Sequence, residues 1–213
     1  MAPNYLLTWS LLIPVKLLVQ AKSRLMGLAD ADRAALALAM AADTVAATVA
    51  CSAVRAVVVV SDDAVVGAEL AALGAHIIAD QPGDGLNSAL TFGAAHAAAR
   101  WPAGGLAALT ADLPALAAAE LAAALEAASA VTHGFVADAA GTGTTLYTVG
   151  PGAPFRPRFG PGSREQHRRT GAVELDVPML SGLRQDVDTL ADLHSAAAIG
   201  LGPRTARLLA RSA

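Results

Sequence analysis

The chain has 213 residues, of which 54% are hydrophobic and 15% are charged, and its net charge is -3 at pH 7. This length suits one domain with a sizeable core, and the high apolar content excludes an intrinsically disordered chain. A slightly acidic chain without a basic, aromatic-rich stripe gives no indication of nucleic-acid binding. Cys51 is the only cysteine, which excludes an intramolecular disulfide and any cysteine-based zinc site. We expect it to be a small buried hydrophobe.

The N-terminal apolar run predicts no membrane attachment. It covers residues 5–19, is interrupted by Pro14 and Lys16, and is shorter than the roughly 20 residues of a transmembrane helix. It also lacks the basic region and small-residue cleavage site of a signal peptide. We therefore expect a cytoplasmic protein.

The first 130 residues alternate between predicted strands and predicted helices. Strands are expected at residues 6–15, 55–60, 75–79 and 106–112. Helices are expected from Asp30 or Asp32 to about residue 51, at residues 64–73, from Asn87 or Ser88 to residue 100, and at residues 116–128. Four strand–helix units predict an α/β domain with a mostly parallel sheet.

The pattern changes beyond residue 130. Two strands, at residues 133–138 and 144–149, flank a glycine-rich turn at residues 141–143. A Gly/Pro/Arg-rich loop at residues 150–163, a polar helix at residues 164–170, a short strand at residues 173–177, a helix at residues 190–199 and a short basic helix follow. Without an internal repeat or a second hydrophobic segment, the sequence predicts one domain over residues 1–213.

Asp112 ends the most apolar of these strands. Strands that are apolar on both faces are typical of parallel sheets covered by helices, and ligands bind beyond the carboxyl ends of such strands. Pro114 prevents the strand from continuing. Two interpretations remain open: Asp112 is a metal ligand, or it is the N-cap of the following helix.

Asp186 and Asp188 are two residues apart, which in an extended segment places both carboxylates on one side. Carboxylates held together in this way suit Mg²⁺, whose coordination is completed by substrate phosphates. The alternative is that Asp188 caps the next helix and Asp186 is simply exposed.

The lysines are unusually placed. The chain has thirteen arginines but only two lysines, Lys16 and Lys22, and both follow the first strand together with Arg24. Compact lysine charges suit neutralisation of a phosphate oxygen, so the sequence predicts phosphate binding in this loop. A solvated loop with lysines placed by chance is the alternative.

Familiar phosphate-binding motifs are missing from the sequence. It contains no G-x-x-x-x-G-K-[ST] string, and residues 13–24 contain no glycine for a Rossmann turn. Residues 141–145 most resemble a hairpin turn, whereas residues 159–163 are rich in N–H donors and precede a helix N-terminus. The five histidines have no metal-ligand spacing, and we interpret them as structural.

Seven motifs occur in a characteristic order. They are Ile13-Pro14-Val15-Lys16 with Ala21-Lys22-Ser23-Arg24-Leu25, Val60-Ser61-Asp62-Asp63, Gly85-Leu86-Asn87, Ala111-Asp112-Leu113-Pro114, Gly141-Thr142-Gly143-Thr144-Thr145, Phe159-Gly160-Pro161-Gly162-Ser163 and Asp186-Val187-Asp188-Thr189. In this order the chain resembles the phosphoenolpyruvate/2-phospho-L-lactate guanylyltransferases of deazaflavin coenzyme F-420 biosynthesis, from about Trp9 to Thr189.

The resemblance implies a nucleotidyltransferase-type, three-layer α/β fold and transfer of GMP from GTP to the phosphate of a three-carbon phospho-acid, with release of pyrophosphate. It implies Mg²⁺ as cofactor, held by Asp112, Asp186 and Asp188, and a catalytic set of Lys16, Lys22, Arg24 and Asp112. The implied nucleotide-binding residues are Pro14, Val15, Ser23, Ser61, Asp62, Asp80, Gly85 and Asn87. The implied substrate-binding residues are Thr144, Thr145, Gly160 and Ser163.

Phosphoenolpyruvate is the expected acceptor. The alanine-rich, lysine-poor composition indicates a GC-rich bacterial source, and bacterial members of the family resemble phosphoenolpyruvate users more often. 2-Phospho-L-lactate and 3-phosphoglycerate remain open, as do a metal-dependent glycosyltransferase and a non-catalytic GTP sensor. Oligomerisation and transfer of the product to the next pathway enzyme are also open.

Overall fold

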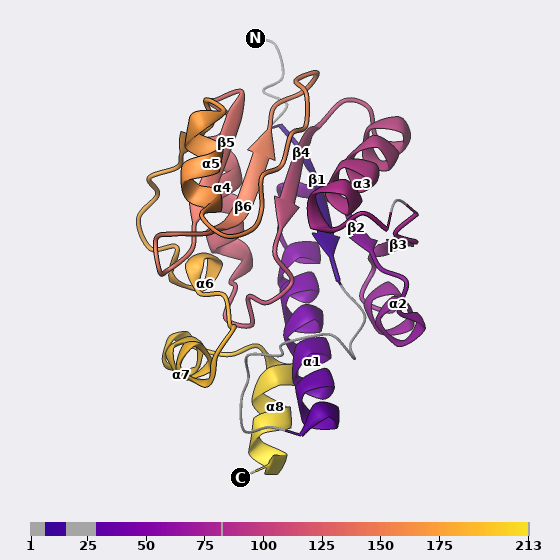
Figure 1. Ribbon diagram of the computed structural model, residues 1–213, viewed down its shortest axis with the longest axis vertical. Helices are drawn as coiled ribbons and strands as arrows, with labels where there is room; N and C mark the ends of the chain where they lie inside the picture. The colour runs from indigo at the N-terminus through magenta and orange to yellow at the C-terminus, as the bar shows by residue number, and fades with distance from the viewer. Residues whose placement is uncertain (1–6, 16–28, 82, 213) are drawn as a thin grey trace.

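The computed structural model describes residues 7–15, 29–81 and 83–212 (Figure 1). The predicted site residues Lys16, Lys22, Ser23 and Arg24 lie outside the described residues, so their roles stay predictions.

The described residues form one sheet and the helices that cover it. The strands are β1 (Trp9–Pro14), β2 (Val54–Val60), β3 (His76–Ile78), β4 (Gly105–Leu109), β5 (His133–Ala137), β6 (Thr144–Val149) and β7 (Val173–Glu174). The helices are α1 (Asp30–Val49), α2 (Ala64–Ala71), α3 (Leu86–Arg100), α4 (Ala118–Ala128), α5 (Ser163–Arg169), α6 (Ser181–Arg184), α7 (Leu190–Ile199) and α8 (Pro203–Ser212).

The sheet has the strand order β3-β2-β1-β4-β6-β5-β7. Only β6 runs antiparallel to its neighbours β4 and β5, and the other pairs are parallel. The prediction of a mostly parallel α/β sheet is therefore confirmed. Because β1 and β4 are adjacent although β2 and β3 intervene in the sequence, the strand order reverses at this pair, which is where ligands bind in open α/β sheets.

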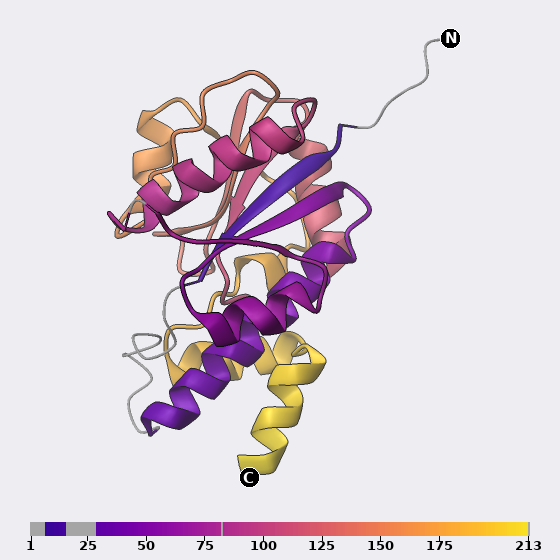
Figure 2. The same ribbon diagram turned by 90° about the vertical axis from the view of Figure 1, so that its right-hand side faces the viewer.

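Helices cover both faces of the sheet and make three layers (Figure 2). Trp9, Leu11 and Ile13 of β1 pack toward α1, α2, α4 and α6. Leu12 points to the opposite face, where it packs with α3 and with the segment after β6. Alternate side chains of one strand therefore enter two different cores, which explains why every residue of β1 except Ser10 is apolar.

A smaller core holds the C-terminal helices against α1. It contains Leu36 and Met40 of α1, Val187, and Leu193 and Ala196 of α7. In addition, the carboxylate of Asp43 accepts hydrogen bonds from the N–H groups of Arg204 and Thr205 (3.1 and 2.8 Å) at the beginning of α8. This core fixes the segment that contains Asp186 and Asp188.

Several element boundaries differ from the prediction. The residue before α3 is Gly85, with φ = 95°, so the prediction that Asn87 or Ser88 caps this helix is wrong. Strand β4 ends at Leu109, three residues before Asp112. Helix α6 was not predicted, since four residues are too few to show a helical period.

Among the described residues, no helix has both the length and the apolar character needed to cross a membrane. Cys51 is 2% exposed and lies just after α1. Its burial raises the pKa of the thiol, although two backbone hydrogen bonds act in the opposite direction. The prediction of a buried, unreactive cysteine agrees with this environment.

Candidate functional site

The parallel strands place their carboxyl ends at one edge of the sheet. Most predicted site residues of the described chain follow these ends or lie at the beginning of β6, which runs in the opposite direction. Those at this edge are Pro14, Val15, Ser61, Asp62, Asp80, Asp112, Thr144 and Thr145. The topology therefore gathers residues from four of the seven motifs, together with Asp80.

Asp112 lies beside the segment that carries the other two predicted metal ligands. The N–H of Val187 donates to the carbonyl oxygen of Asp112 over 3.1 Å. The side chain of Val187 is fully buried, whereas Asp186 and Asp188 on either side of it are partly exposed. The two chain segments predicted to hold a metal are thus joined through their backbones.

Neither alternative interpretation of these aspartates as helix caps agrees with the structure. Helix α4 begins at Ala118, with Ala117 at its N-cap position, six and five residues after Asp112. Helix α7 is capped by Thr189, whose hydroxyl accepts from the Asp192 N–H. Asp112 and Asp188 therefore need another explanation than capping.

The donor set suits Mg²⁺, which prefers oxygen ligands and commonly takes one or two carboxylates together with substrate phosphates. Within the described residues, no three acidic, histidine or cysteine side chains come close enough to hold an ion by themselves. One or two of the three aspartates with phosphate oxygens would satisfy the ion. The magnesium assignment stays a prediction.

Ser61, Asp62 and Asp80 shape the loops after β2 and β3. The carboxylate of Asp62 accepts from the Asp80 N–H (3.0 Å), and the carboxylate of Asp80 accepts from the Gly83 N–H (3.3 Å). The Ser61 hydroxyl accepts from the Asp63 N–H over 3.3 Å. These bonds order the two loops that lead toward Gly85 and α3.

Asn87 connects two sides of the site. Its amide oxygen accepts from the N–H of Phe159 (2.8 Å), and its amide nitrogen donates to the carbonyl of the same residue (2.9 Å). Asn87 was predicted to bind the nucleotide, and the structure shows a paired hydrogen bond to the loop before α5. The predicted substrate residues Gly160 and Ser163 lie in or directly after this loop.

His167 is completely buried in α5 and joins this loop to β6. Its Nε2 accepts from the N–H of Arg158 (2.9 Å), so the ring proton is on Nδ1, which donates to the Thr144 hydroxyl (3.0 Å). The ring also stacks on Tyr147, with 4.7 Å between the centroids. His167 therefore positions Thr144 relative to the loop that contains Gly160.

Burial lowers the pKa of His167 from 6.5 to about 4, and the positive charge of Arg158 acts in the same direction. A backbone hydrogen bond at Ser163 opposes this effect. The ring is consequently neutral at physiological pH. The ring therefore orients neighbouring groups through its hydrogen bonds and does not act as an acid catalyst.

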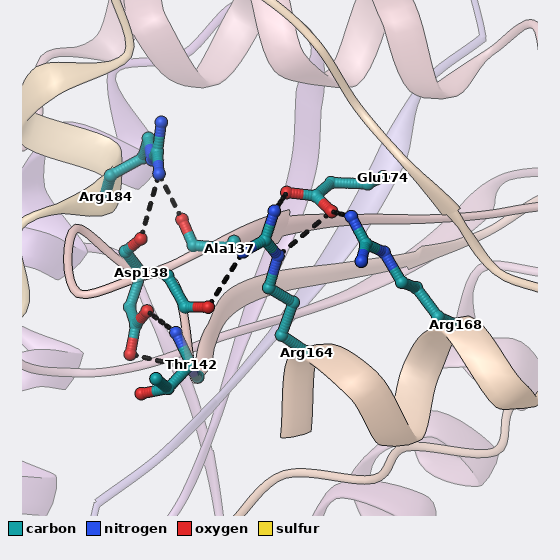
Figure 3. Close-up of polar contacts among 9 residues, drawn as sticks. Ala137, Asp138, Thr142, Arg164, Arg168, Glu174 and Arg184 are labelled. Carbon is teal, nitrogen blue, oxygen red and sulfur yellow. Dashed lines mark hydrogen bonds and ion pairs between the residues drawn. The ribbon is translucent and has the colours of Figure 1, made fainter. Parts of the chain in front are cut away.

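The turn between β5 and β6 is built around Asp138, which is 8% exposed (Figure 3). Its carboxylate accepts from the N–H groups of Thr142 and Gly143, both at 2.8 Å. A Cβ atom at position 143 would collide with this carboxylate, which explains the glycine. The glycine-rich turn is thus a hairpin, as predicted, and these two N–H groups already have a carboxylate partner.

Two arginines bind the backbone carbonyls of this hairpin (Figure 3). Arg184 of α6 donates to the carbonyls of Ala137 and Asp138, both at 3.1 Å. Arg164 donates to the carbonyl of Gly141 (2.9 Å) and forms an ion pair with Glu174 (2.9 Å). Burial raises the pKa of Glu174, but hydrogen bonds and charges from Arg164 and Arg168 outweigh it and lower the pKa overall.

Two buried hydroxyls lie where β4 and β6 meet at the site. The N–H of Thr110 donates to the carbonyl of Thr145 (3.0 Å), and the hydroxyls of both residues make no hydrogen bond to any described residue. Buried hydroxyls of this kind call for a water or ligand partner. Thr145 was predicted, whereas Thr110 was missed because a threonine after an apolar strand has no distinctive pattern.

Comparison with known proteins identifies the relationship of this chain. The family model described as "Guanylyl transferase CofC like" matches residues 9–200. A phosphoenolpyruvate guanylyltransferase from Thermomonospora curvata is 57% identical over 205 residues, which cover 96% of this chain and 90% of the relative.

Solved structures give the same fold at low sequence identity. One from Desulfovibrio desulfuricans, described as a nucleotide-diphospho-sugar transferase, has a TM-score of 0.60 at 17% identity, covering 90% of this chain and 96% of the other. A nucleotidyl transferase from Methanothermobacter has a TM-score of 0.56 at 16% identity, covering 90% and 97%. The fold is therefore that of the nucleotidyltransferases, and the chain belongs to the CofC-like guanylyl transferase family.

Proposed function

We propose that this protein is a phosphoenolpyruvate guanylyltransferase of coenzyme F-420 biosynthesis. It transfers GMP from GTP to the phosphate of phosphoenolpyruvate and forms enolpyruvoyl-2-diphospho-5'-guanosine and pyrophosphate. The observation that carries this proposal is the 57% identity, over 96% of the chain, to an enzyme with that name.

The acceptor phosphate requires no general base. A phosphomonoester has a second pKa near 6 and is therefore close to doubly ionised at neutral pH. A neutral, fully hydrogen-bonded His167 is compatible with such a reaction. The protein has to align two anions that repel each other and to neutralise the departing pyrophosphate, and positioning with electrostatic stabilisation does this in phosphoryl-type transfer.

The residues divide between these tasks. Lys16, Lys22 and Arg24, in the sequence after β1, would bind and neutralise the GTP phosphates. One or two of Asp112, Asp186 and Asp188 would hold Mg²⁺ together with phosphate oxygens, and the bound ion would neutralise phosphate charge and orient the phosphates.

The guanosine and the acceptor would occupy opposite sides of β4. The loops with Ser61, Asp62, Asp80 and Gly85 would surround the guanosine, as would Pro14, Val15 and Ser23. The carboxylate of the acceptor would bind between Thr144 and Thr145 on one side and Gly160 and Ser163 on the other. His167 and Asn87 support the second group, because His167 binds the backbone of Arg158 and Asn87 binds that of Phe159.

The test is pyrophosphate release from GTP and Mg²⁺ with phosphoenolpyruvate, 2-phospho-L-lactate or 3-phosphoglycerate supplied separately. We expect release with phosphoenolpyruvate and little with the other two acids. Release with only one of those acids would retain the transfer reaction but overturn the proposed acceptor. If no acid supports release while GTP still binds, the protein is a GTP sensor and the proposed reaction is wrong.

A further inference from the structure

The backbone around Asp112 has left the sheet. Strand β4 ends at Leu109, so residues 111–113 have no neighbouring strand to bind their peptide groups. Buried peptide groups nevertheless need hydrogen-bond partners. Their partners determine how firmly the Asp112 side chain is held.

Thr44, in the middle of α1 and 0% exposed, supplies two of these partners. Its hydroxyl donates toward the carbonyl of Ala111 (3.2 Å) and accepts from the N–H of Leu113 (3.1 Å). The same hydroxyl also lies 2.9 Å from the carbonyl of Met40, so its one proton is shared between a helix carbonyl and the Ala111 carbonyl. One side chain thus binds the peptide groups immediately before and after Asp112.

A third bond completes the arrangement. The carbonyl of Asp112 itself accepts from Val187, which lies between Asp186 and Asp188. The backbone of Asp112 is therefore fixed by α1 on one side and by the second aspartate-bearing segment on the other. A small shift of Thr44 would move the carboxylate relative to that segment.

The neighbouring threonine shows that this arrangement is particular to Thr44. Thr48 is one turn later on α1 and is equally buried at 0% exposure. Its hydroxyl bonds to the carbonyl of Thr44 within the helix (2.7 Å), which is the usual bond of a threonine inside a helix. The two residues differ in that only Thr44 is shown bonding outside α1 to the described chain around Asp112.

We propose that Thr44 is a positioning residue that holds the Asp112 carboxylate in the orientation needed to bind the divalent cation, which in turn binds the GTP phosphates. This inference rests on the proposed role of Asp112. Groups that orient a metal ligand from behind typically change metal affinity or activity by about 10–100-fold when they are removed. Thr44 has no part in binding substrate; it acts through Asp112.

The test compares Thr44→Val with Thr48→Val, because both substitutions remove a buried hydroxyl from the same helix and keep its shape. Mn²⁺ binding in the presence of GTP, followed by electron paramagnetic resonance without turnover, is measured together with kcat and KM. We expect Thr44→Val to weaken Mn²⁺ binding and lower kcat by roughly 10-fold or more. Thr48→Val should remain within about twofold of the unmodified protein, and Thr44→Ser, which keeps the hydroxyl, should restore most of the loss.

Two further variants keep the result interpretable. Asp112→Asn should weaken Mn²⁺ binding strongly, and if it does not, the metal assignment of the proposed function fails and the inference fails with it. If Asp112→Asn has this effect but Thr44→Val behaves like Thr48→Val, the proposed function stands and the role of Thr44 is overturned.

Should Thr44→Val not fold, Thr44→Cys replaces it, because a thiol donates and accepts only weakly. Affinities in the order Thr, Ser, Cys support the proposal, and equal affinities contradict it.

Discussion

The buried histidine makes the stability of this protein depend on pH in a specific way. His167 has a pKa of about 4 in the folded protein, against about 6.5 in an unfolded chain. Between these values the unfolded chain takes up a proton that the folded protein does not. Stability therefore rises with pH in this window, and the contribution of His167 is fully present above pH 6.5 and lost as the pH falls to 4.

The size of the effect follows from the shift in pKa. A difference of this size corresponds to about 3 kcal/mol in the free energy of unfolding, of which about 2 kcal/mol is lost by pH 5. The structural cause is that a protonated ring would carry a charge among Tyr147, Phe135 and Phe159. It would also convert Nε2 into a donor facing the N–H of Arg158.

The assay is urea denaturation of the unmodified protein and of His167→Phe at pH 7, 6, 5 and 4. Phenylalanine keeps a stacked ring but lacks the two hydrogen bonds of His167, so we expect the variant to be less stable at pH 7. Because phenylalanine cannot titrate, the variant should lose less stability on acidification. His96→Phe, which alters an exposed histidine of α3, is the control and should follow the unmodified protein. Parallel curves for the unmodified protein and His167→Phe between pH 7 and pH 4 would refute the reasoning.

Three predictions concern activity. Asp112→Asn should abolish turnover, because the proposed cation loses a carboxylate ligand, and near-normal pyrophosphate release in this variant would exclude the assignment. Lys22→Ala should lower kcat by roughly 10²-fold, the effect of losing one preorganised charge-stabilising group; an unchanged rate would make Lys22 a surface residue. Asn87→Ala should raise the KM for phosphoenolpyruvate about 10-fold, since it removes two hydrogen bonds to the loop around Phe159. A change mainly in the KM for GTP would instead favour the nucleotide-binding role predicted for Asn87.

The sequence predicted the alternation of strands and helices because the apolar pattern differs between the two. Apart from Ser10 and Arg55, strands β1, β2 and β4 are apolar on both faces, as buried parallel strands are. Helix α6 could not be predicted, because four residues are too few to show a helical period. The end of β4 at Leu109 could not be predicted either, because the residues that follow it bind Thr44 and Val187, which are far away in the sequence.

The candidate site also contains residues that can be selected from the sequence and residues that cannot. Charged residues that follow a strand can be selected as candidates from their position and type, as Asp112 is. Residues that work through long-range contacts carried no such signal: Thr44 has the appearance of an ordinary helix residue, and His167 was interpreted only as structural. Their importance depends on bonds to Leu113 and Arg158, which the fold creates.

The most direct measurement follows the α-phosphate of GTP. The protein is incubated with Mg²⁺, phosphoenolpyruvate and GTP labelled at the α-phosphorus, and the products are separated. The account predicts that the label appears in a diphosphate joining guanosine to the enolpyruvoyl group, with one pyrophosphate released for each label transferred. Label that remains in GTP, or that appears only as free GMP, would contradict guanylyl transfer to phosphoenolpyruvate.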